Sequence, residues 1–138
     1  EELRDVVFAL IADQLALAAR AEAGCPLVIG TAGTCGTGTM VDWLHEITRD
    51  CLRELGLTAR IALVRSDQAP ADVARAMRAG RVRPLDGAPD TGPETVETCT
   101  NVVALAGAEQ IAAALETGAD IVIAGRTTDT AIIAALPL

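Results

Sequence analysis

The sequence predicts an α/β fold: an open, mostly parallel four-stranded sheet with helices on both faces, Rossmann-like, and part of a larger domain. Short apolar runs alternate with amphipathic segments along the chain, which is typical of strand–helix units with right-handed crossovers. Hydrophobic residues make up 51% of the 138 residues, yet there is one Phe, one Trp and no Tyr. Such an aliphatic composition suits helices packed closely on a parallel sheet.

Apolar runs bounded by turn residues predict the strands. They span residues 26–31, 59–65, 101–106 and 120–124. In parallel sheets, ligands bind beyond the carboxyl ends of the strands. The loops at 30–39, 65–68 and 125–130 should therefore meet at one edge of the sheet, and a functional site is expected there.

Helical periodicity predicts the other elements. The expected helices cover residues 3–23, 40–55, 69–79 and 107–117, and a last one ends near residue 136. Thr91 and Glu94 have the spacing of a capping box, so a short helix should begin there. Turn signals between these helices predict a long loop over residues 80–93. We expect residues 1–138 to form a single α/β domain or a fragment of one.

Composition excludes several classes of function. A net charge of −8 argues against binding to nucleic acid or to an anionic membrane surface. The absence of Lys and Tyr excludes Schiff-base chemistry and a phenolic acid or base in this chain. No apolar run reaches the roughly 20 residues of a membrane span, so a cytoplasmic location is expected. The four cysteines form no Cys-x-x-Cys pair, which predicts reduced thiols and no metal site.

The segment from Gly30 to Thr39 is rich in glycine and lies between a predicted strand and a predicted helix. Glycine lets a ligand approach the main chain, and a helix N-terminus directs several N–H groups at one point. The loop therefore predicts a site for phosphate, carboxylate or a thioester oxygen. Its candidate anion-binding residues are Gly33, Thr34, Gly36, Gly38 and Thr39. The alternative is a tight turn whose glycines serve packing alone.

This glycine-rich loop fits neither common nucleotide motif. A dinucleotide-binding fingerprint would need a glycine where Val41 stands, and a phosphate-binding P-loop would need a lysine. Cys35 lies in the same loop near a helix N-terminus, where a thiolate would be stabilised, but the sequence places no base beside it. His45 falls on the polar face of the following helix and is interpreted as a solvated side chain.

Polar residues also follow two other predicted strands. Arg126 could hold a carboxylate or phosphate with help from Thr128, and Asp129 could act as a general acid or base. Asp67 is the second candidate for proton transfer. The alternatives are that Thr128 caps a helix, with Asp129 favourable in its first turn, and that Asp67 is an ordinary turn residue.

Arg81 and Arg83 alternate within the predicted long loop. In an extended loop the two side chains would face the same way and could clamp an anion. The alternative is that both arginines are simply solvated.

Three segments together resemble the family named for acyclic terpene utilisation. They are Pro26–Thr34, Ala79–Leu85 and Gly118–Ile132, and they occur in the family's order. Family members are longer than this chain, and the resemblance covers residues from about 25 to 138, an internal part of the main domain. It implies a bacterial protein in the catabolism of branched or terpenoid acids as coenzyme A thioesters. The family supplies no established catalytic residue to carry over.

Two functional hypotheses follow. The first is a ligand-binding or catalytic domain of a lyase- or hydratase-like enzyme that acts on a branched or terpenoid organic acid or its acyl-CoA thioester. Coenzyme A would then enter only as part of the substrate. The second is a non-catalytic interaction or scaffold domain of a multi-subunit assembly. In both cases the rest of a longer chain, or other subunits, are expected partners.

Overall fold

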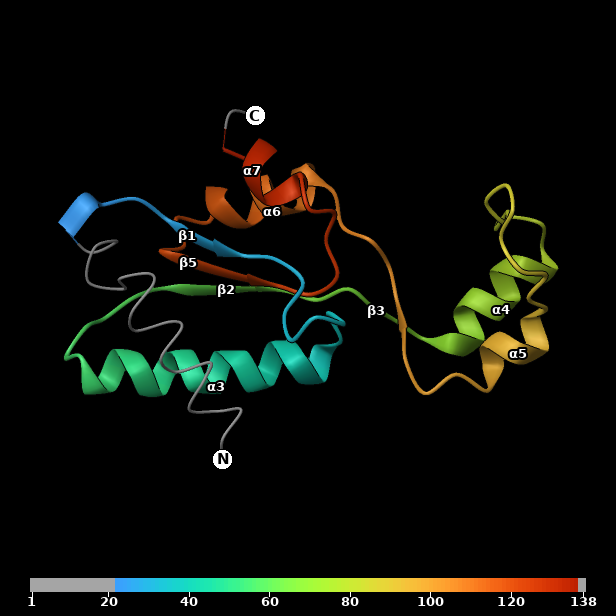
Figure 1. Ribbon diagram of the computed structural model, residues 1–138, viewed down its shortest axis with the longest axis horizontal. Coiled ribbons are helices and arrows are strands. Elements are labelled where there is room, and N and C mark those ends of the chain that lie inside the picture. Colours follow the sequence, from blue (N-terminus) through green and yellow to red (C-terminus); the bar gives the residue numbers. More distant parts are fainter. Residues whose placement is uncertain (1–21, 137–138) are drawn as a thin grey trace.

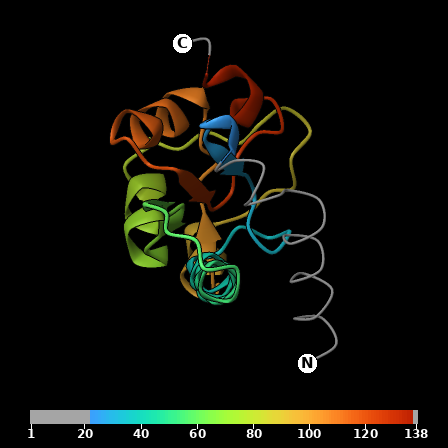
Figure 2. The same ribbon diagram turned by 90° about the vertical axis from the view of Figure 1, so that its left-hand side faces the viewer.

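Three parallel strands form the central sheet of the computed structural model, which describes residues 22–136 (Figure 1). The strands are β1 (Leu27–Ile29), β5 (Ile121–Ala124) and β2 (Ile61–Val64), in that spatial order. Helix α3 (Gly38–Glu54) covers one face, and α6 (Ala108–Glu116) and α7 (Ala131–Ala134) cover the other (Figure 2). The α/β class, the parallel sheet and the helices on both faces are therefore confirmed.

The central strand β5 carries the core. Its four residues are fully buried, because helices cover both faces of the sheet and a strand flanks each edge of β5. Alternation along the strand sends Ile121 and Ile123 into the cluster beneath α3. Val122 and Ala124 face the clusters that α6 and α7 cover.

Helix α3 presents an apolar stripe to the sheet, with buried Val41, Leu44 and Ile47 at helical spacing. Buried Thr48 also lies on this stripe, and its hydroxyl donates a hydrogen bond to the Leu44 carbonyl at 2.8 Å. The buried hydroxyl is therefore satisfied, and the helix can pack directly on the strands.

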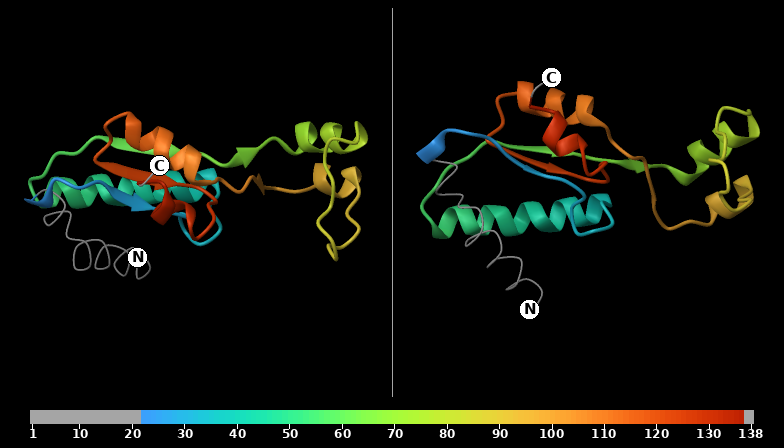
Figure 3. Two further views of the ribbon diagram at one scale, coloured as in Figure 1. Left: turned by 90° about the horizontal axis from the view of Figure 1, so that it is seen from above. Right: turned by 45° about the horizontal axis from the view of Figure 1, so that its top comes forward.

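A two-stranded antiparallel ribbon leads away from the sheet. Strand β3 (Asp67–Gln68) pairs with β4 (Val102–Val103), and the ribbon connects to α4 (Pro70–Arg78) and α5 (Pro93–Glu97). We call residues 70–97 the outer lobe. The two helices pack on each other and lie apart from the sheet (Figures 1 and 3).

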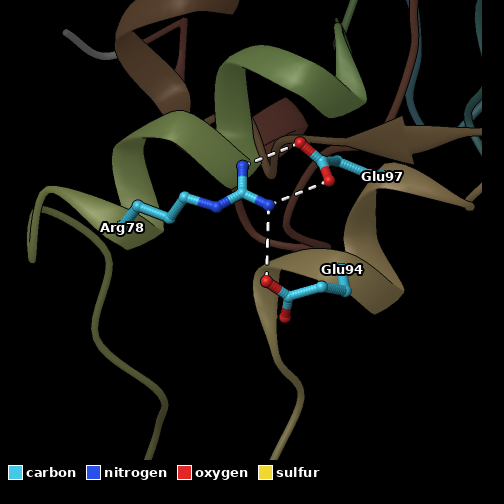
Figure 4. A network of polar contacts seen from close by, with 3 residues as sticks. All are labelled: Arg78, Glu94 and Glu97. Atoms are coloured by element: carbon cyan, nitrogen blue, oxygen red, sulfur yellow. Dashed lines mark hydrogen bonds and ion pairs between the residues drawn. The ribbon is translucent and has the colours of Figure 1, made fainter.

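An exposed ion-pair network joins the two helices of the outer lobe (Figure 4). The Arg78 guanidinium donates to both carboxylate oxygens of Glu97, at 2.7 and 2.9 Å, and reaches Glu94 at 3.4 Å. These contacts raise the pKa of Arg78 and lower the pKa of Glu97. Residues 80–92 between the helices carry no regular structure.

The prediction of four strands in one sheet is wrong. Only two residues of the expected strand 101–106 are extended in a ladder, and they pair antiparallel with β3. The chain leaves the sheet at Asp67 and must return past the same point, so the returning segment pairs with the outgoing one. The Rossmann-like description is also not supported, because β5 lies between β1 and β2, whereas successive strands are neighbours in each half of that fold.

Two helix predictions differ in detail. The expected capping box at Thr91 does not form, because α5 begins at Pro93 with Gly92 as its N-cap. The last helix is shorter than expected and ends at Ala134. Most of the helix predicted over 3–23 lies outside the described residues. Within residues 22–136, no helix is both long and apolar enough to cross a membrane.

Candidate functional site

The loops that follow the three parallel strands meet at the carboxyl-end edge of the sheet, as expected. The Arg126 amide donates to the Gly36 carbonyl at 3.1 Å, which joins the loops after β5 and β1. The Ser66 hydroxyl donates to the Arg126 carbonyl at 3.1 Å, which joins the loops after β2 and β5. One continuous set of hydrogen bonds therefore fixes all three loops relative to one another.

The glycine-rich loop folds back on itself. The amide of Gly36 donates to the Ala32 carbonyl at 2.9 Å, and the amide of Cys35 donates to the Gly33 carbonyl at 2.8 Å. Gly36 has φ +70°, and a Cβ atom at this position would lie 2.3 Å from the backbone nitrogen of Arg126. A side chain at position 36 would therefore push the two loops apart, which favours the packing explanation for this glycine.

The N-terminus of α3 already faces a carboxylate from the chain itself. The Gly38 amide donates to Asp67 Oδ1 at 2.9 Å, so Asp67 caps the first turn from the neighbouring strand end. Arg65 pairs with Asp42 and lowers the pKa of that carboxyl, while the charge of Asp67 helps to raise the pKa of Arg65. The position predicted for a ligand anion is thus occupied by a side chain at Gly38.

The hydroxyl groups of buried Thr127 and Ser66 and of half-buried Thr31 hold the edge together, and the sequence analysis missed them. Thr127 is 3% exposed, and its amide donates to the Thr31 hydroxyl at 3.2 Å. The Thr31 hydroxyl donates in turn to the Thr127 carbonyl at 3.2 Å. With Ser66, each of the three loops contributes one small hydroxyl residue two or three positions after a strand end, and this pattern could have indicated them.

The returning segment 104–106 crosses the same edge. The Ala104 amide donates to the Ser66 carbonyl at 2.7 Å, and the Ala106 amide donates to the Arg126 carbonyl at 2.9 Å. The Thr128 amide donates to the Ala106 carbonyl at 3.1 Å. The main chain of the loops is therefore largely engaged, and the chemistry available to a ligand lies in side chains.

The exposed side chains at this edge include Cys35, Arg126 and Asp129. Within residues 22–136, neither Arg126 nor Asp129 forms an ion pair. The Cys35 sulfur lies 3.6 Å from the Thr37 hydroxyl, and hydrogen bonds from the Thr37 amide and hydroxyl lower the pKa of the thiol. The arginine can bind an anion, the carboxylate can move a proton, and the thiol can act as a nucleophile.

Comparison with known proteins adds one decisive match. The family model described as acyclic terpene utilisation family protein AtuA matches residues 11–138. The chain belongs to the acyclic terpene utilisation family. The resemblance noted in the sequence is confirmed, and the match extends further toward the N-terminus than the resemblance did. No curated protein and no solved structure matches the chain.

The three segments that resemble this acyclic terpene utilisation family divide between two regions of the fold. Pro26–Thr34 and Gly118–Ile132 contain β1 and β5 with their following loops, so they build the carboxyl-end edge. Ala79–Leu85 belongs to the outer lobe (Figure 1).

The structure brings most of the predicted site residues to one edge, but not all of them. Gly33, Thr34, Gly36, Gly38, Thr39, Asp67, Arg126, Thr128 and Asp129 belong to the three loops at the carboxyl ends or to the first turns that follow them. Arg81 and Arg83 are exposed and belong to the outer lobe, which lies apart from the sheet (Figure 3). No group of three metal-ligating side chains comes together among the described residues.

Proposed function

We propose that this chain is the ligand-binding and catalytic α/β part of a lyase- or hydratase-like enzyme. Its substrate class is a branched or terpenoid organic acid or the acyl-CoA thioester of such an acid. Membership of the acyclic terpene utilisation family supports this class of substrate. The observation that carries the proposal is the carboxyl-end edge, where hydrogen-bonded loops present exposed Arg126 and Asp129 side chains that form no ion pair within residues 22–136.

In this proposal, Arg126 binds the anionic group of the substrate. A guanidinium can form two parallel hydrogen bonds to a carboxylate or phosphate, and this geometry also orients the ligand. The Arg126 main chain is fixed on both sides, by the Gly36 and Ser66 contacts, so its side chain starts from a rigid base. Thr128 and the exposed residues Gly33, Thr34 and Thr39 belong to the same edge and complete the proposed anion-binding site.

Asp129 carries the proton in this proposal. Hydration of an α,β-unsaturated thioester requires a base to take a proton from water while the water oxygen bonds to the β carbon. The electron pair of the double bond moves toward the thioester carbonyl, and the α carbon then accepts a proton. Asp129 is exposed, whereas the Asp67 carboxylate is engaged with the Gly38 amide. We therefore assign the base to Asp129 and keep Asp67 as the second candidate.

The test uses the full chain and 3-methylcrotonyl-CoA, a short branched enoyl thioester. We expect saturable binding, and we expect the loss of enoyl absorbance to reveal turnover. Arg126→Gln should weaken binding ten-fold or more, because it removes charge-assisted hydrogen bonds. Asp129→Asn should abolish turnover and leave binding nearly unchanged. Arg75→Gln, an exposed arginine that pairs with Asp72 within α4, is the matched control.

The second function, a non-catalytic interaction domain, is favoured by one observation. In the outer lobe, Leu85 is 84% exposed and Val82 is 43% exposed, while Ala74 is buried. Exposed apolar residues on a projecting lobe are typical of a contact surface. Binding of the thioester without turnover, with partner subunits added, would support this function and contradict the catalytic one.

A further inference from the structure

A cavity lies along the C-terminal half of α3, at the opposite end of the sheet from the candidate site. It has a volume of about 490 Å³ and lies between α3 and the chain that leads into β2. Three basic side chains from α3 line it: His45, Arg49 and Arg53. Residues spaced by four lie on the same side of a helix, so their alignment follows directly from the sequence.

Part of the lining of this cavity is apolar because of the way α3 ends. Gly56 has φ +65°, and the Leu57 amide donates to the Leu52 carbonyl at 2.9 Å. This is a Schellman motif, which turns the chain back and places Leu57 against the last turns of the helix. Leu52, Leu57 and Ile61 line the cavity together with the basic residues.

The charge around the cavity is opposite to that of the chain as a whole. The chain carries 19 acidic residues and a net charge of −8. Yet the charged side chains that line this cavity, among the described residues, are all basic. Asp42 lies one turn before His45, but it is held by Arg65. Within residues 22–136, Arg49 forms no ion pair.

Local helix stability does not account for this basic stripe. Arg53 lies in the last turn of α3, where a cation interacts favourably with the helix dipole, and it also pairs with Asp50 at 2.8 Å. His45 and Arg49 lie further from the C-terminus, and the dipole effect falls off beyond the last turn. The presence of both side chains in one lining with Leu52, Leu57 and Ile61 needs another explanation.

We propose that this cavity binds a small amphiphilic anion, a carboxylate with a short apolar body. Arg49 binds the carboxylate with His45 beside it, and Leu52 and Leu57 contact the apolar body. The volume falls within the range of about 300–1,000 Å³ that small-molecule sites occupy. This site is separate from the carboxyl-end edge and does not depend on the function proposed there.

The test is a calorimetric titration of the full chain with three probes at one ionic strength. Octanoate carries both the carboxylate and the apolar body, octan-1-ol carries only the body, and inorganic phosphate carries only a charge. We expect octanoate to bind saturably, and at least ten-fold more tightly than either other probe. Arg49→Gln should weaken octanoate binding ten-fold or more, and Arg75→Gln should leave it unchanged.

Several outcomes would overturn this assignment. If octan-1-ol bound as tightly as octanoate, the cavity would act only as a hydrophobic surface. If phosphate bound as tightly as octanoate, binding would reflect an unspecific charge effect. Loss of octanoate binding in Arg126→Gln but not in Arg49→Gln would move the anion to the carboxyl-end edge. His45→Gln is the second variant, so the proposal stays testable if Arg49→Gln fails to fold. No saturable octanoate binding would also refute it.

Discussion

The parallel sheet and the outer lobe are stabilised in different ways. In the sheet, aliphatic side chains are buried on both faces of β5. In the outer lobe, residues of α4 and α5 other than Ala74 retain solvent exposure, and an exposed ion-pair network joins the helices. Burial of apolar surface contributes far more to stability than exposed ion pairs do. We therefore expect the sheet to set the global stability and the lobe to open locally.

The largest expected effect comes from the core of the sheet. Ile123→Ala removes a fully buried side chain from the central strand and should lower the free energy of unfolding by about 2–5 kcal/mol. The control, Val82→Ala in the outer lobe, should change it by less than about 0.5 kcal/mol, because Val82 is exposed. Urea denaturation measures both values, and similar losses for the two variants would contradict the comparison.

The next effect comes from the contact between the loops. Gly36→Ala must adopt φ +70° and also place a methyl group 2.3 Å from the Arg126 nitrogen. Gly87→Ala in the outer lobe has a similar φ of +77°, but nothing lies within 4 Å of the added Cβ. Backbone strain should cost both variants about 1–2 kcal/mol, and only Gly36→Ala should lose more. Equal losses in urea denaturation would show that the loops can separate freely.

A smaller effect is expected from the cap on α3. Asp67→Ala removes the acceptor for the Gly38 amide and should cost about 1 kcal/mol. Asp129→Ala removes an exposed carboxylate that forms no ion pair within residues 22–136, and it should be nearly neutral. Thermal melts of the pair compare them directly. A neutral Asp67→Ala would mean that solvent caps the helix equally well.

The smallest effect should be confined to the lobe and should depend on pH. The pKa of Glu97 is below its ordinary value because Arg78 binds its carboxylate. The contact therefore stabilises the lobe fully at pH values above the ordinary pKa of a glutamate. The stabilisation is lost as pH falls through the lowered pKa, when the carboxylate becomes protonated. The protection factors of the α5 amides, which compare the observed exchange rate with the intrinsic rate at the same pH, should therefore fall at low pH and in Arg78→Gln.

The matched control for this exchange experiment is Arg75→Gln. Arg75 pairs with Asp72 inside α4 and does not join the two helices. Hydrogen exchange of the α5 amides in Arg75→Gln should match that of the unchanged protein. Exchange that accelerates equally throughout β5 would show that the lobe and the sheet unfold as one unit.

Local sequence patterns predicted helix α3 and strand β5. The apolar spacing of Met40, Leu44, Ile47, Cys51 and Leu55 predicted α3, and the run Asp120–Ala124 predicted β5. The segment at Val102 was also recognised as extended, but extended propensity does not specify the direction of pairing. Its partner depends on where the chain leaves the sheet, which is a property of the whole fold.

For the candidate site, the sequence predicted the edge of the sheet but not the contacts of the individual side chains. The rule that ligands bind beyond parallel strand ends placed Asp67, Arg126 and Asp129 at one edge. It could not show that the Asp67 carboxylate caps α3, because this contact joins residues 29 positions apart. Nor could it exclude Arg81 and Arg83, since their distance from the edge depends on the ribbon formed by β3 and β4.

Asp67 belongs mechanically to both regions of the molecule. Its main chain pairs with Val103 in the ribbon that carries the outer lobe, while its side chain holds the first turn of α3. A swing of the lobe that displaces the ribbon at this residue must therefore either drag the start of α3 with it or break the bond to Gly38. Through these two contacts of Asp67, a displacement of the lobe reaches the glycine-rich loop without passing through the core.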